Sequence, residues 1–193
     1  MSRQISFSFD VQKFVNAAAY LAQHCNDFTR MKLAKLLYFA DKEHLRAYGR
    51  PVIGDRYIKM EWGPVPSKAY DLIKHDERID VEAQGLFDRY FDVAGNDVKA
   101  KLPPNLAYLS ESDREILDDV LAKYGHLTPI QLSKLSHREP AWEKAAMNSL
   151  MDYRLFLAGD DEMGSLVQED QELKDALEEV EMEEFLESIS LRS

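Results

Sequence analysis

The sequence predicts a mainly helical α+β protein, in which a compact helical domain carries a small antiparallel β-sheet or hairpin and an acidic C-terminal helix or tail. Apolar residues recur at helical spacing through most of the chain. Glycine and proline clusters separate these segments, and a few short stretches alternate polar and apolar residues as strands do. With 193 residues, of which 45% are hydrophobic, the chain is long enough to bury a sizeable core.

Two helices are predicted near the N-terminus. Asp10 is a capping residue before a helix whose apolar positions between 11 and 21 are three and four residues apart. Thr29 opens a second helix with the same spacing between 33 and 40, and Gly49 marks its end. We expect both helices to build the core.

A short strand and a short helix are predicted next. Residues 56–62 alternate polar and apolar side chains, and Gly63 and Pro64 are expected to stop this strand. Pro66 fits the first turn of a helix over residues 68–74, because its missing N–H would be unpaired there.

A β-hairpin is predicted from two segments rich in β-branched and aromatic residues. Residues 86–93 and 98–102 flank a turn that contains Gly95. We expect the hairpin to form one small sheet with the strand at 56–62.

Three helices are predicted in the last part of the body. Ser112 and Glu115 match a capping box, and Gly125 ends the helix that follows. The sequence from Thr128 to Gln131 repeats the start signal for a helix to about residue 137. Pro140 then opens a helix over 140–147, and the folded body is expected to end near residue 159.

Charge is spread very unevenly. Residues 160–193 hold 13 of the 35 acidic side chains but only two of the 24 basic ones, so they carry the whole net charge of −11. This predicts a formally neutral domain at 1–159 and an acidic amphipathic extension at 160–193, which favours a basic partner. Apolar residues of the extension share helical spacing and are candidate partner contacts: Leu173, Leu177 and Val180. A solubilising or self-docking helix is an equal alternative.

The sequence lacks the motifs that mark common catalytic and cofactor-binding sites. The sequence holds no phosphate loop, dinucleotide fingerprint, nucleophile elbow or zinc helix, so we expect neither an enzyme nor a cofactor. His24 and Cys25 are adjacent and diverge on a helix, and the histidines show no ligand spacing, so we expect no catalytic residue and no metal. No signal peptide or membrane span is recognisable, and the single cysteine fits a reducing compartment, so we expect a cytoplasmic protein.

Several ordered motifs resemble one known family. The matching residues are 32–41, 48–55 and 62–65, which read KLAKLLYFAD, YGRPVIGD and WGPV, followed by LSKLSH at 132–137 and PAW at 140–142. This series resembles the Panacea, or SocA-like antitoxin, domain, also described as a phage-associated GepA-like protein. The resemblance implies a mostly helical bacterial or prophage domain, some members of which neutralise unrelated toxins by direct binding.

The residues of these motifs are interpreted as architectural. Turns are expected at Gly49, Gly54, Gly63 and Pro64, and large packing anchors at Trp62 and Trp142. His137 is expected to bond carbonyls at a helix end and Pro140 to start the next helix. Polar residues within the motifs are candidates either for a partner-binding surface or for a buried network: Lys35, Tyr38, Asp41, Arg50 and Asp55.

The expected function is therefore neutralisation of a cognate, basic toxin in a toxin–antitoxin or phage-defence module, with homo-oligomerisation open. We expect no membrane association and no direct contact with nucleic acid. The alternative is a DNA-binding transcriptional regulator that uses residues 128–147 as a helix-turn-helix, and that could repress its own operon. That segment offers mainly Lys144 to phosphates, which weakens the alternative.

Overall fold

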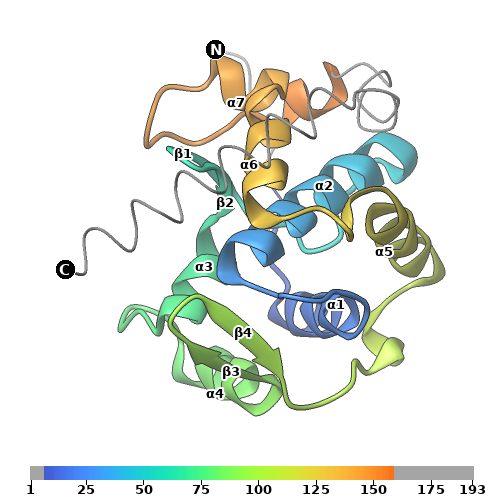
Figure 1. Ribbon diagram of the computed structural model, residues 1–193, viewed down its shortest axis with the longest axis vertical. Coiled ribbons are helices and arrows are strands. Elements are labelled where there is room, and N and C mark those ends of the chain that lie inside the picture. Colours follow the sequence, from blue (N-terminus) through green and yellow to red (C-terminus); the bar gives the residue numbers. More distant parts are fainter. Residues whose placement is uncertain (1–6, 159–193) are drawn as a thin grey trace. The chain divides into compact units, whose positions relative to one another are not determined.

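The computed structural model describes residues 7–158 (Figure 1) and confirms the mainly helical α+β class. The acidic extension, with Leu173, Leu177 and Val180, lies outside the described residues. The elements are α1 (Val11–His24), α2 (Arg30–Tyr48), β1 (Tyr57–Met60), β2 (Gly63–Pro66), α3 (Ser67–Lys74), α4 (Val81–Tyr90), β3 (Phe91–Ala94), β4 (Asp97–Ala100), η1 (Leu106–Tyr108), α5 (Glu111–Tyr124), α6 (Pro129–His137), α7 (Pro140–Lys144) and η2 (Tyr153–Ala158).

Helix α2 runs through the middle of the body, and α1, α5, α6, β2 and η2 all pack against it. Its predicted core residues, including Leu33 and Leu36, are fully buried. Thr29 caps the helix by accepting a hydrogen bond from Lys32 N at 3.2 Å, and Gly49 ends it in the left-handed region. The two boundaries of this helix therefore follow the sequence signals.

Within residues 7–158, four strands form two separate antiparallel hairpins instead of the single sheet that we expected. Hairpin β1–β2 packs on α2 and α6, whereas β4 packs on α1. The outer edge of β4 is occupied by the loop before α2, since Val98 N donates to Phe28 O at 2.9 Å and Arg30 N donates to Asn96 O at 2.8 Å. These bonds close the β4 edge of the second hairpin to the first.

Two predicted strand boundaries are wrong. Residues 86–90 belong to α4, because the carboxylate of Asp80 caps that helix and Phe87 packs its ring on Phe14 in the core. Pro64 does not stop a strand but lies within β2. In an antiparallel strand, every second residue points its N atom away from the partner strand. Ser67 N points toward β1, because it donates to Arg56 O. The N atoms of Pro66 and Pro64, one and three residues earlier, therefore point away from β1, where a missing N–H costs no hydrogen bond of the hairpin.

Two helix predictions also need correction. The capping box of α5 uses Ser110 and Asp113 rather than Ser112 and Glu115. Helix α7 ends at Lys144 rather than at 147, because the chain turns extended at Ala145. Residues 148–151 then run beside β1, where Lys59 N donates to Ser149 O at 3.0 Å. The capping box from Thr128 to Gln131 and the end of α5 at Gly125 are confirmed.

Candidate functional site

Two segments that lie far apart in the sequence meet beside α2. Ser133 of α6 donates a hydrogen bond from Oγ to Trp62 O at 3.0 Å. Trp142 of α7 donates from Nε1 to Met60 O at 3.2 Å. The tip of hairpin β1–β2 is therefore attached to both α6 and α7. We call the side chains of Lys59, Met60, Trp62, His137 and Trp142 at this junction the tryptophan face.

A three-layer stack forms part of the tryptophan face. The rings of His137 and Trp142 stack with centroids 4.0 Å apart and planes 16° apart. The ammonium of Lys59 lies 4.0 Å from the centroid of the Trp142 ring, an arrangement that contributes about 0.5–1 kcal/mol at exposed sites. Lys59 also donates to Ala145 O at 3.1 Å. The stack holds the half-buried Trp142 in one orientation.

Trp62 is not the core anchor that the sequence suggested, because 47% of it is exposed. It occupies the tight turn between β1 and β2, where a side chain projects away from both strands. Only its carbonyl is used to attach the hairpin. Met60, at the start of the same turn, is also exposed. Trp62 therefore offers a large ring at little conformational entropy for a partner to bury.

Gly63 fits the hairpin closely onto the helices beneath it. A Cβ atom at Gly63 would lie 2.3 Å from Ser136 Oγ and 2.9 Å from Lys35 Cε, and the φ angle there is +95°. Lys35 donates from Nζ to Pro64 O at 3.0 Å. Burial lowers the pKa of Lys35 to about 7, and no carboxylate of the described part pairs with it.

A buried ion pair fixes the start of α7 to α2. Lys42 Nζ lies 2.8 Å from Glu139 Oε2, and Tyr38 donates to the same oxygen at 3.3 Å. Burial, and after it the Glu139 charge, raises the pKa of Tyr38. Glu139 and Lys42 were not recognised in the sequence. The only local sign was that Tyr38 and Lys42, four residues apart, share one face of α2.

Asp41 and Asp55 hold the loop that leads into the hairpin. Asp41 accepts from Ile53 N at 2.9 Å and from Tyr57 Oη at 3.1 Å, and burial raises its pKa to about 7. Asp55 accepts from the N–H groups of Lys68 and Ala69 at 3.1 and 2.8 Å. These are orphan donors of the first turn of α3, so Asp55 caps a helix that begins without a side-chain cap of its own.

A second polar cluster ties α1, α2 and α5 together around Asp113. Arg50 Nη1 and Lys13 Nζ donate to its two oxygens at 2.9 and 2.7 Å, and His44 Nε2 lies 3.1 Å away. Burial alone raises the pKa of Asp113, but the hydrogen bonds from His44, Lys13 and Ser110 outweigh it and hold that pKa far below its usual range. This long-range cluster explains why the capping box includes Asp113.

Of the two roles considered for the polar motif residues, a binding surface or a buried network, their positions fit the buried network. Lys35, Tyr38, Asp41 and Asp55 are all buried, and Arg50 is half-buried over Asp113. The left-handed φ angles at Gly49, Gly54 and Gly63 match the predicted turns. Pro140 begins α7 as expected. His137 makes a backbone hydrogen bond to Glu61 of the hairpin turn instead of to a helix end, and its Nε2 has no hydrogen-bond partner within residues 7–158. The motifs therefore build a support for the tryptophan face.

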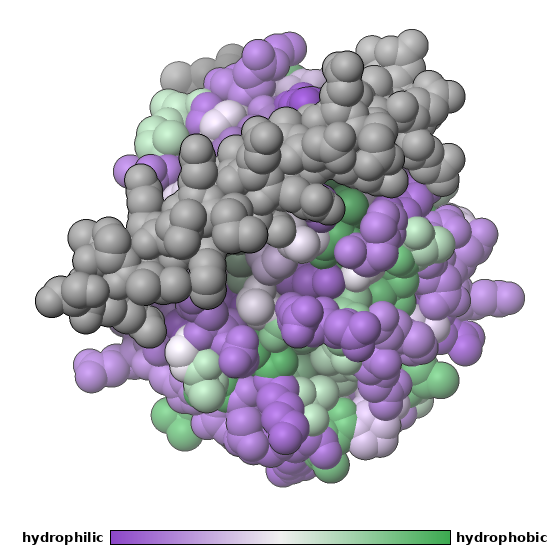
Figure 2. Space-filling view, in the orientation of Figure 1, coloured by the Kyte–Doolittle hydropathy of each residue, from purple (hydrophilic) through white to green (hydrophobic). Residues whose placement is uncertain are grey.

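The surface around these elements is mixed. In the orientation of Figure 1, hydrophilic residues cover most of the described surface, and hydrophobic residues form small separate groups (Figure 2). Within residues 7–158, no group of His, Cys, Asp and Glu side chains could hold a metal ion, and no helix is long and apolar enough to cross a membrane. Helix α7 has only five residues, so its length does not favour the helix-turn-helix alternative.

One comparison with known proteins identifies a relationship. The family described as antitoxin SocA-like, Panacea domain, matches residues 33–143, which is more than half of the chain. The matched segment contains every residue of the tryptophan face and its buried support. No curated protein and no solved structure matches the chain.

Proposed function

The chain belongs to the antitoxin SocA-like, Panacea-domain family, and we propose that it neutralises a cognate toxin by direct protein–protein binding through the tryptophan face. One observation carries the choice of surface: within the matched segment, nearly half of Trp62 is exposed, while the polar motif residues Lys35, Tyr38, Asp41 and Asp55 are buried. A motif that builds a rigid support under an exposed tryptophan is suited to binding rather than to catalysis.

The chemistry of the tryptophan face fits a protein partner. Tryptophan dominates the binding energy of many protein interfaces, and methionine adapts its shape to different partners. Trp142 and His137 lie in a fixed stack, so little side-chain entropy is lost when a partner covers them. Lys59 adds a charge at the edge of the stack, where it orients an approaching partner more than it adds affinity.

The acidic extension supplies a second part of the proposal. Residues 160–193 carry the net charge of −11, and Leu173, Leu177 and Val180 share helical spacing within them. We propose that the extension binds a basic region of the toxin. Its carboxylates would speed the encounter, and its apolar residues would add contact area. Direct neutralisation needs no enzyme activity, membrane association or nucleic-acid contact of this chain.

The test starts from the product of the neighbouring gene, expressed with and without this protein, followed by co-purification and measurement of the Kd. We expect rescue of growth and a stable complex. Trp62→Ala should weaken binding by about 2 kcal/mol, or roughly 30-fold, without changing the melting temperature. The control is Tyr108→Ala, a similarly exposed aromatic residue on η1, which packs on α1 rather than on hairpin β1–β2.

Two results would contradict the proposal. Rescue without a complex would argue against direct binding, and equal affinities of the Trp62 and Tyr108 variants would place the interface elsewhere. Removal of residues 160–193 tests the extension separately. If the extension contributes electrostatically, the truncated chain should bind the toxin more weakly than the full chain, and the difference should grow as the salt concentration is lowered. An unchanged affinity of the truncated chain would show that the extension is not part of the interface.

A further inference from the structure

A hollow of about 560 Å³ opens where four helix ends come together. It lies between the end of α1, the first turn of α2, the end of α5 and the start of α6, away from the tryptophan face at the other end of α6. Its wall includes the apolar side chains of Leu127 and Pro129, and its ionisable residues are His24, Asp27, Lys32 and His126. This volume lies within the range of small-molecule sites, roughly 300–1,000 Å³.

Lys32 is the unusual member of this lining. Only 4% of it is exposed, yet its ammonium makes one hydrogen bond, to Asn26 O at 3.3 Å, and pairs with no carboxylate among residues 7–158. An ammonium has three donors, and burying its charge without a counter-ion is unfavourable. A buried ammonium is usually paired with a carboxylate. Lys42, which is as buried as Lys32, lies 2.8 Å from Glu139 Oε2.

Other features of the hollow add positive potential. The first turn of α2 contains Arg30 and Lys32 but no acidic residue, although the N-terminal end of a helix carries partial positive charge. His24 and His126 line the same hollow, and an imidazole N–H can donate a hydrogen bond to an anion. Asp27 is the opposing charge, but it lies beyond ion-pair distance of Lys32.

We propose that this hollow is a binding site for a small organic anion, in which Lys32 is the counter-ion of a phosphate or carboxylate group and Leu127 and Pro129 contact an apolar body. The ligand supplies the carboxylate or phosphate partner that Lys32 lacks among residues 7–158. Because it bridges four helix ends, its binding stabilises the folded body. The site does not depend on the proposed toxin-binding function.

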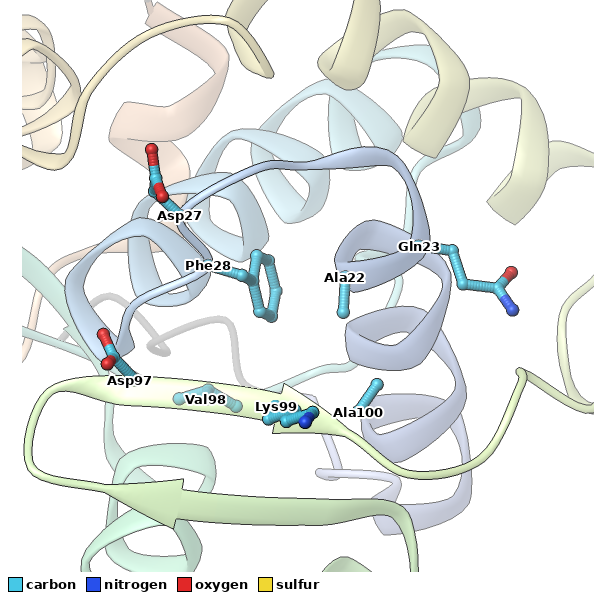
Figure 3. A pocket seen from close by; sticks show the side chains of 8 residues that line it. All are labelled: Ala22, Gln23, Asp27, Phe28, Asp97, Val98, Lys99 and Ala100. Carbon is cyan, nitrogen blue, oxygen red and sulfur yellow. The ribbon is translucent and has the colours of Figure 1, made fainter.

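A neighbouring hollow provides the matched control. It has a volume of about 460 Å³ and lies between the end of α1 and β4, where Phe28, Ala22 and Ala100 converge on the opening (Figure 3). Its lysine, Lys99, is exposed to solvent, so its charge needs no partner. The hollows thus differ in the feature on which the proposal rests.

The experiment measures the melting temperature of the full chain, and its amide NMR shifts, with four probes: inorganic phosphate, phenyl phosphate, benzoate and the neutral benzyl alcohol. Phenyl phosphate or benzoate is expected to raise the melting temperature and to shift amides of residues 24–27 and 125–129, and the stronger of the two identifies the anionic group. Stabilisation by inorganic phosphate alone would contradict the apolar contact. Equal stabilisation by benzyl alcohol would contradict the ionic one.

Two variants separate the ionic role of Lys32 from a structural one. Lys32→Met should fold at least as stably as the wild type without a probe, because Asn26 is exposed and water replaces the lost hydrogen bond. It should bind the anionic probe at least about 10-fold more weakly, or about 1.4 kcal/mol. Lys99→Met should bind like the wild type. Equal binding by both variants, or no amide shifts in the wild type, would overturn the proposal.

Discussion

A single methyl group at Gly63 tests how tightly the hairpin is seated on α2 and α6. The φ angle of +95° is unfavourable for any residue with a Cβ atom, at roughly 1–2 kcal/mol. The added Cβ would also meet Ser136 Oγ and Lys35 Cε at 2.3 and 2.9 Å, and overpacking of this kind costs about 1–3 kcal/mol. We therefore expect Gly63→Ala to lower the free energy of unfolding by about 2–5 kcal/mol.

Gly49→Ala is the matched control, because Gly49 has a φ angle of +73° but no atom within 4 Å of an added Cβ. It should lose only the strain of roughly 1–2 kcal/mol. Urea unfolding of both variants measures the difference. Ser136→Ala removes the nearest clashing atom, so the double variant Gly63→Ala/Ser136→Ala should lose less than the sum of the two single losses. Equal losses at Gly63 and Gly49, or a strictly additive double variant, would refute the close seating of the hairpin.

Three further predictions concern the buried charges beneath the tryptophan face. Glu139→Gln removes the nearer counter-ion of the buried Lys42 and leaves only Glu43 Oε1, at 3.9 Å. It should cost about 3–5 kcal/mol in urea unfolding, whereas the double variant Glu139→Gln/Lys42→Met should recover much of that loss. The pKa of Lys35 falls from 10.5 to about 7 on folding, so the unfolded chain binds more protons than the folded chain between pH 7 and 10.5. The contribution of Lys35 to the free energy of unfolding therefore rises with pH in that range. Lys35→Met should abolish that rise and should be more stable than the wild type below pH 7. The pKa of Asp41 rises from 3.8 to about 7 on folding, so the folded chain binds more protons than the unfolded chain between these values. The contribution of Asp41 to the free energy of unfolding therefore falls as the pH rises from about 4 to 7. Asp41→Asn should remove that fall, and an unchanged pH profile of unfolding in this variant would contradict the prediction.

Features that depend on neighbours in the sequence were predicted well. Asp10, Thr29 and Thr128 cap helices by bonding N–H groups three residues ahead, so each signal is complete within one turn. The left-handed turn at Gly49 is equally local. The series of motifs was sufficient to identify the family, and its buried leucines follow from helical spacing.

Features that depend on distant partners were not predicted. Residues 86–90 have strand-like composition, yet Phe87 packs on Phe14 as part of a helix. The capping box of α5 is displaced to Asp113, which Lys13 and Arg50 also bind from elsewhere in the chain. In both cases tertiary packing outweighs a local preference of at most about 1 kcal/mol.

The sequence by itself determined the helical class, most helix boundaries and the family, because these depend on spacing and capping within a few residues. Only the tertiary structure decided which motif residues are exposed. Trp62 faces solvent because it lies in a two-residue turn, and Glu139 is buried because Lys42, 97 residues away, supplies its counter-ion. The lack of a carboxylate partner for Lys32 among residues 7–158 likewise became visible only in the tertiary structure, because a missing partner leaves no mark in the sequence.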